Sequence, residues 1–106
     1  MLSVWQDEMV EVRIAVASGA YVDGELQEHA EPGAPIQMLR IEPRDSDMRM
    51  LPEGTQVSRA MVFYEEGAQS ASEGDHIHFG SEIFIVHGVR DQRKYGGFVR
   101  YVTVMK

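Results

Sequence analysis

Apolar and polar side chains alternate with a period of two along most of this chain, and this alternation constrains its fold more than any other feature. Between residues 9 and 17, valine and isoleucine fill every second position from Val10, which predicts a half-buried strand. Further strands are predicted over residues 36–43 and 57–66, on both sides of Gly80-Ser81, and over 97–106. Strands at this spacing predict a mainly β fold, a small antiparallel β-barrel or sandwich with one short helix and long loops.

Turn-forming residues separate the predicted strands. Asp23-Gly24 predicts a tight turn, because glycine accepts positive φ and aspartate bonds its own backbone. Residues 27–35 (QEHAEPGAP) are expected to form an exposed loop. Residues 44–54 (RDSDMRMLPEG) predict a helix of one to two turns, capped by Asp45 or Ser46 and ended by Pro52. We therefore expect one β-barrel domain over residues 10–106, preceded by an N-terminal arm over residues 1–9.

Charge and cysteine content argue against several classes of function. The chain carries 17 acidic and 10 basic side chains, a formal charge of −7, so it is not expected to bind duplex DNA by neutralising phosphates. It has no cysteine, which excludes disulfides, thiolate zinc sites and cysteine nucleophiles and fits a reducing cytoplasm. No apolar run approaches the roughly 20 residues that span a membrane, so no membrane partner is expected.

Residues 74–89 (GDHIHFGSEIFIVHGV) hold three of the four histidines and predict a β-hairpin that turns at Gly80-Ser81. With a two-residue turn, Phe79 pairs with Glu82 and Ile77 pairs with Phe84. One face of the hairpin then points into the core, and the other carries the histidines. The complete set of expected core residues is Val12, Ile14, Ile77, Phe79, Phe84, Val86 and Val102.

The histidine face of this hairpin is not expected to bind a metal. His76, His78 and His87 lie along a line, and His87 is about 13 Å from His78, too far for one ion to bind all three. A site with two histidines, His76 with His78 or His87, is the alternative, but no carboxylate lies on this face to complete it. Ile83 and Ile85 share the face, so it should be covered by the other sheet, the short helix or a neighbouring subunit.

No catalytic motif is present. The sequence has no G-x-S-x-G, H-E-x-x-H, P-loop or G-x-G-x-x-G, the usual devices for nucleophilic, zinc and phosphate chemistry. We therefore expect no catalytic residue, no metal site and no cofactor.

Several short motifs occur in a familiar order: SGAYVDGEL, a proline-flanked strand, MLPEG, a strand ending in VFYEE, GDHIHFGSEIFIVHGV and YGGFVRYVTV. In this order and spacing, over about residues 10–106, the chain resembles the head–tail joining proteins of tailed bacteriophages. These are the small head-completion or connector subunits between portal and tail. The family often has an aromatic residue shortly after the D-G turn, where this chain has Leu26 and Gln27, and the His76–His78 pair is not one of its features.

The resemblance implies a structural virion protein without catalysis or cofactor. Copies of the chain would form a ring that closes the DNA-filled head and provides a docking surface for the tail. Its partners would be a portal or adaptor protein on the head side and a tail tube or tail-completion protein on the tail side. Genomic DNA would pass through the ring without sequence-specific binding. The protein would be made in the host bacterial cytoplasm and lie in the neck of the virion. A tail-completion or terminator subunit and a generic small β-barrel binding module are the alternatives.

The resemblance also suggests where subunits meet. Asp23-Gly24 matches the turn of the first long hairpin, residues 51–54 match the segment leading into the central strand, and Gly74-Asp75 with Gly80 match the opening of the late hairpin. Residues 1–32 carry seven acidic side chains and one basic, whereas the segment RDQRKYGG is basic. We therefore expect this basic loop to contact acidic positions of a neighbouring subunit or of the portal-side partner. The expected assembly residues are Tyr21, Asp23, Gly24, Leu51, Pro52, Glu53, Gly54, Arg90, Arg93, Lys94 and Tyr95.

Overall fold

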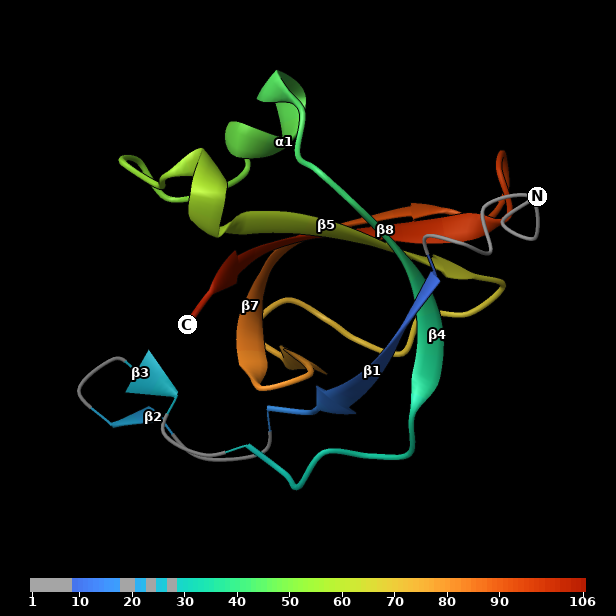
Figure 1. The fold of residues 1–106 in the computed structure, drawn as a ribbon, viewed down its shortest axis with the longest axis horizontal. Coiled ribbons are helices and arrows are strands. Elements are labelled where there is room, and N and C mark those ends of the chain that lie inside the picture. The colour runs from blue at the N-terminus through green and yellow to red at the C-terminus, as the bar shows by residue number, and fades with distance from the viewer. Residues whose placement is uncertain (1–8, 18–20, 23–24, 27–28) are drawn as a thin grey trace.

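Six antiparallel strands close into a barrel (Figure 1). The structure, a computed structural model, describes residues 9–17, 21–22, 25–26 and 29–106. The strands of the barrel are β1 (Met9–Ala15), β4 (Ile36–Ile41), β5 (Ala60–Glu66), β6 (His76–Phe79), β7 (Glu82–Gln92) and β8 (Phe98–Met105). They follow the order β1-β4-β5-β8-β7-β6, and β6 closes the barrel by pairing with β1, Ile77 opposite Ile14. The sequence left a barrel and a sandwich open, and the structure is a barrel.

A second, two-stranded sheet lies outside the barrel in the connection from β1 to β4. It pairs β2 (Tyr21–Val22) with β3 (Glu25–Leu26), Val22 opposite Glu25. This pairing is the one expected around a two-residue turn, although Asp23 and Gly24 themselves lie outside the described residues. The ends of the connection are tied together, because Ala17 and His29 form a β-bridge.

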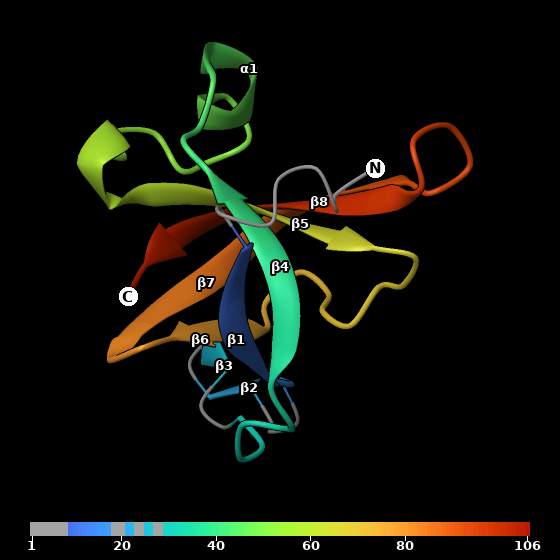
Figure 2. The ribbon, with the colours of Figure 1, turned by 45° about the vertical axis from the view of Figure 1, so that its right-hand side comes forward.

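One short helix, α1 (Asp45–Met48), follows β4 and lies above the barrel in Figure 2. The expected caps were wrong: Arg44 is the N-cap, because its backbone N–H donates to the Asp47 carboxylate at 2.8 Å. Residues 57–59 also differ from the predicted strand, since they form a 3₁₀ turn, η2 (Val57–Arg59), closed by the Arg59 N–H to Gln56 O bond at 3.0 Å. This turn redirects the chain from the helix into β5, so the strand begins at Ala60.

The barrel interior holds the first hydrophobic core. Of the predicted core residues, five are buried there and Phe79 packs against them half-buried. Phe63 of β5 meets the rings of Phe84 and Phe79 edge-on, with centroids 5.5 and 6.4 Å apart. The buried members of this core are Val12, Ile14, Met38, Phe63, Ala71, Ile77, Phe84, Val86, Val99 and Tyr101.

A second core lies outside the barrel, between the outer faces of β5 and β8 and the residues around α1. Its buried members are Leu51, Ala60, Val62 and Val102, with Met48 and Met50 packed against them. Val102 is therefore a core residue, as predicted, but it belongs to this second core. Successive residues of β5 and β8 point alternately into the two cores, which explains why both strands are apolar on both faces.

The β6–β7 hairpin has the predicted register. Phe79 pairs with Glu82, and Ile77 pairs with Phe84. Beyond the hairpin, β7 runs on to Gln92 with a bulge between Val86 and Gly88 where it pairs with β8. The polar segment RDQRKYGG is therefore not all loop: its first three residues are strand. Figure 2 shows the end of the β7–β8 hairpin projecting from the barrel.

Candidate assembly surface

The end of the β7–β8 hairpin carries exposed basic and aromatic side chains. Tyr95 is 88% exposed, Lys94 before it is exposed, and so is Arg90, which lies in β7 opposite Arg100. The turn itself is closed by backbone bonds, because the N–H groups of residues 95, 96 and 97 all donate to the Gln92 carbonyl. We call Arg90, Lys94 and Tyr95 the hairpin tip. An aromatic side chain flanked by cations is suited to contact an acidic protein surface, since aromatic anchors contribute strongly to binding.

Arg93, another of the expected assembly residues, is also exposed but pairs with a carboxylate of its own hairpin. Its guanidinium pairs with both carboxylate oxygens of Asp91, at 2.9 Å from Nε and 2.6 Å from Nη2. The hydrogen bond from the Arg93 side chain is the main reason why the pKa of Asp91 lies below its ordinary value. Arg93 therefore has its carboxylate partner within its own hairpin, and the charge that the tip offers to a partner comes from Arg90 and Lys94.

The second expected assembly segment, residues 51–54, divides into a buried and an exposed part. Leu51 is only 8% exposed and packs in the second core, so its assignment to an assembly surface is corrected. The apolar outer faces of β5 and β8 draw this side chain inward. Pro52, Glu53 and Gly54 are exposed. The Thr55 hydroxyl donates to the Pro52 carbonyl at 2.6 Å and fixes the turn.

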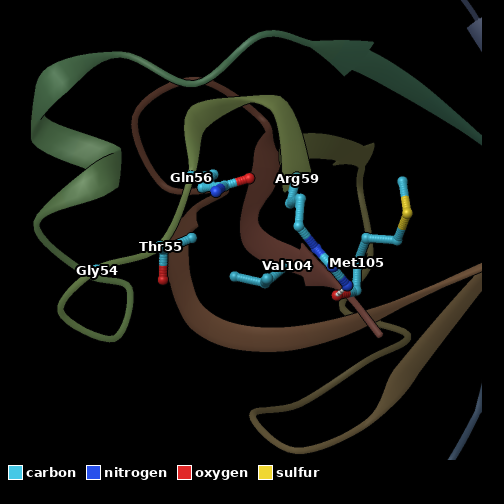
Figure 3. Close-up of a pocket in the computed structure, with 6 residues that line it drawn as sticks. All are labelled: Gly54, Thr55, Gln56, Arg59, Val104 and Met105. Carbon is cyan, nitrogen blue, oxygen red and sulfur yellow. Dashed lines mark hydrogen bonds between the residues drawn. The ribbon is translucent and has the colours of Figure 1, made fainter.

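An open hollow of about 330 Å³ lies beside this turn, between η2 and the end of β8 (Figure 3). Arg59 reaches across it, and its Nη2 donates to the Met105 carbonyl at 3.0 Å. Among the described residues, the lining offers one cation, already bonded to a backbone carbonyl, and no carboxylate or histidine to act as a base. It is formed by Gly54, Thr55, Gln56, Arg59, Val104 and Met105.

The expected assembly residues do not gather into one patch. Both views place the turn at residues 53–59 and the hairpin tip on opposite sides of the molecule (Figures 1 and 2). The β2–β3 sheet lies at a third place, below the barrel in these views. Tyr21 is in β2, and Asp23 and Gly24 lie outside the described residues. The expected assembly residues that the structure describes therefore lie on separate surfaces of the chain.

A buried polar cluster connects β5, β8 and the loop after β5. The Tyr101 hydroxyl donates to Glu65 Oε1 at 2.7 Å, and the Ser70 backbone N–H donates to the same oxygen at 2.7 Å. The Ser70 hydroxyl donates to the other oxygen, Glu65 Oε2. Burial, with the bond to Glu65, raises the pKa of Tyr101. Both carboxylate oxygens are bonded to protein groups, so the cluster anchors the loop after β5 to the barrel.

The histidine face of the β6–β7 hairpin is partly covered, and the side chain that covers it was not anticipated. His76 is only 8% exposed, because the ring of His29 stacks on it with centroids 3.6 Å apart and planes 17° apart. The rings of His76 and His78 are 6.5 Å apart. Ile83 and Ile85 are half-buried. No sequence pattern links His29 to His76, since the connection between β1 and β4 must fold back to bring them together.

Over residues 9–17, 21–22, 25–26 and 29–106, no group of three or more histidine, aspartate or glutamate side chains is placed to hold a metal ion. No helix within the same ranges has the length and apolar character to cross a membrane.

Comparison with known proteins assigns no family. No family model and no curated protein matches this sequence.

Proposed function

We propose that this chain is a structural virion subunit of the kind that joins head and tail in tailed bacteriophages. Copies would form a ring in the neck of the virion, between a portal or adaptor protein and a tail tube or tail-completion protein. The ring would close the DNA-filled head, offer a docking surface to the tail and let DNA pass without reading its sequence. The proposal assigns the chain no catalysis and no cofactor.

The observation that carries the proposal is the combination of a closed barrel with a projecting, tyrosine-tipped hairpin. The barrel agrees with the fold that the motif order implies. The hairpin places Tyr95, 88% exposed, at the end of a strand pair that extends beyond the barrel. A large aromatic side chain held away from its own core is suited to insertion between subunits.

Assembly through the hairpin tip would combine apolar burial with charge attraction. Tyr95 would bury its ring against a neighbour, while Arg90 and Lys94 would lie near acidic side chains of that neighbour or of the portal-side partner. Each exposed charge pair contributes only about 0.2–1 kcal/mol, but a ring repeats the same contact at every interface. Ionic strength should therefore change the affinity without abolishing it.

The test is addition of purified protein to DNA-filled heads that lack this subunit, across a salt series, followed by tail attachment. The variant Lys94→Glu/Tyr95→Ala should fold normally but fail to complete heads, whereas Arg49→Glu, an exposed charge change beside α1, should complete them. Completion by the hairpin-tip variant at low salt contradicts the proposed interface. Wild-type protein that adds to tails but not to heads indicates the tail-completion role, and protein that adds to neither indicates a binding module outside the virion.

A further inference from the structure

Two histidines from distant parts of the chain form a stacked pair where the connection from β1 to β4 returns to the barrel. The rings of His29 and His76 lie 3.6 Å apart and nearly parallel. His29 Nε2 lies 2.9 Å from the Gly74 carbonyl, and because a carbonyl only accepts, Nε2 carries a proton and donates it.

Hydrogen bonds around the pair join the two ends of the β1–β4 connection to each other and to the residue before His76. The Ala17 N–H donates to Asp75 Oδ1 at 2.8 Å, and the Ala30 N–H donates to the Val16 carbonyl at 2.9 Å. The other oxygen of Asp75 accepts from the Ser72 N–H at 2.8 Å, which holds the carboxylate in place. We call this arrangement of His29, His76, Asp75 and the Ala17 and Ala30 amides the histidine clamp.

The surroundings of His76 disfavour positive charge. Burial is the main cause that lowers its pKa to about 4 from 6.5, and His29, Lys106 and His78 lower it further, while Asp75 opposes them. On the neighbouring strands His76 pairs with the uncharged Ala15 and Ile85, and the nearest charged side chain in register is Arg13, which pairs with His78. Among the described side chains, Asp75 is thus the one acidic group that favours a charged imidazole.

We propose that the stacked pair makes the histidine clamp sensitive to pH, closed when both imidazoles are neutral and opened by protonation. Two imidazolium rings in face-to-face contact repel each other, and a charged His76 also loses its hydration when the clamp closes. Opening frees the returning end of the β1–β4 connection from the loop that precedes β6. This inference rests on the geometry of the pair and holds whether or not the chain acts in a virion.

The direction of the pH effect follows from proton linkage. His76 binds a proton more weakly in the closed clamp than in the open one, so the open state gains protons first as the pH falls. The closed state keeps its full stability above about pH 6.5 and loses it between there and about pH 4. At pH 5.0 the opening equilibrium should be about thirty-fold higher than at pH 7.5 if His76 alone titrates.

The experiment is amide hydrogen exchange of Ala17 and Ala30 by NMR between pH 7.5 and 5.0, corrected for the intrinsic pH dependence of exchange. In the wild type the protection of both amides should fall about thirty-fold. In His76→Phe, which keeps a stacked ring but cannot be charged, their protection should not depend on pH.

Two further variants complete the test. His87→Gln removes a histidine of the same hairpin that lies outside the pair and should keep the wild-type pH dependence. His29→Phe replaces the partner imidazole with a ring that cannot be protonated and serves if His76→Phe does not fold; it should reduce the fall in protection. Constant protection in the wild type, or an undiminished fall in both phenylalanine variants, overturns the proposal.

Discussion

Asp47 of α1 and Arg100 of β8 form a buried ion pair that fixes the short helix against the outer face of the barrel. The Asp47 side chain is 2% exposed and that of Arg100 10%. Arg100 also donates to the Tyr64 hydroxyl, and its guanidinium lies 5.2 Å from the centre of the Tyr64 ring. Its Nε has no hydrogen-bond partner within the described part of the chain. Asp47 is therefore the main group that compensates the buried positive charge of Arg100.

Removing Asp47 should therefore destabilise the protein strongly. Asp47→Ala leaves a buried, unpaired guanidinium and should lower the free energy of unfolding by about 3–5 kcal/mol in urea denaturation. Asp45→Ala, at an exposed acidic position of the same helix, should change it far less. The double variant Asp47→Leu/Arg100→Met should recover most of the loss, because it removes both charges together. Equal losses in the single and double variants would contradict this account.

Gly88 and Met50 should be energetically coupled. A Cβ at Gly88 would lie 2.3 Å from Met50 Cε, the end of a flexible side chain, so Gly88→Ala must displace this methyl group within the second core. We expect a loss of roughly 0.5–1.5 kcal/mol in the wild type, because the Met50 side chain must rearrange, and almost none in a Met50→Ala background. Met48→Ala, a methionine change in the same segment, is the matched control and should leave the cost of Gly88→Ala unchanged. Additive effects of Gly88→Ala and Met50→Ala would show that the two side chains do not compete for space.

Tyr101 should make stability depend on pH in the alkaline range. Its folded-state pKa lies above the ordinary value of 10.0, so the unfolded chain releases this proton first, and the stability it contributes is lost as the pH rises above 10. The free energy of unfolding of the wild type should therefore fall more steeply above pH 10 than that of Tyr101→Phe. At pH 7 the substitution should cost about 1–3 kcal/mol, because Glu65 loses a buried donor. Tyr95→Phe, at an exposed position, is the control, and parallel curves for wild type and Tyr101→Phe would refute the assignment.

Phe84 should be among the most sensitive positions of the barrel core. Its side chain is 2% exposed and contacts Phe63 edge-on. Phe84→Ala should lower the free energy of unfolding by about 3–5 kcal/mol through lost burial and the cavity left behind. Val57→Ala, at a residue 62% exposed, should change it little. A loss of less than about 1 kcal/mol at Phe84 would mean that the barrel interior refills the cavity.

Local periodicity and turn chemistry by themselves determined much of this fold. The register of the β6–β7 hairpin, with Ile77 opposite Phe84, follows from a two-residue turn and an alternation that buries one face. The same reasoning identified Val12, Ile14 and Val86 as core residues and placed a short helix after β4. These features depend on residues close together in the chain. A shift of the strand register by one residue would expose an entire apolar face to solvent.

The way in which the connecting segments pack against the closed barrel decided the rest. Val102 and Leu51 are buried in a second core that exists only because the α1 region folds over β5 and β8. Asp47 meets Arg100, and His29 meets His76, across long stretches of sequence whose composition gives no sign of either contact. The alternation of apolar and polar residues along a strand shows that one face is apolar, but it does not show which element covers that face. Which element covers each face, and which charges and imidazoles are thereby brought together, is settled by how the connecting segments return to the closed barrel.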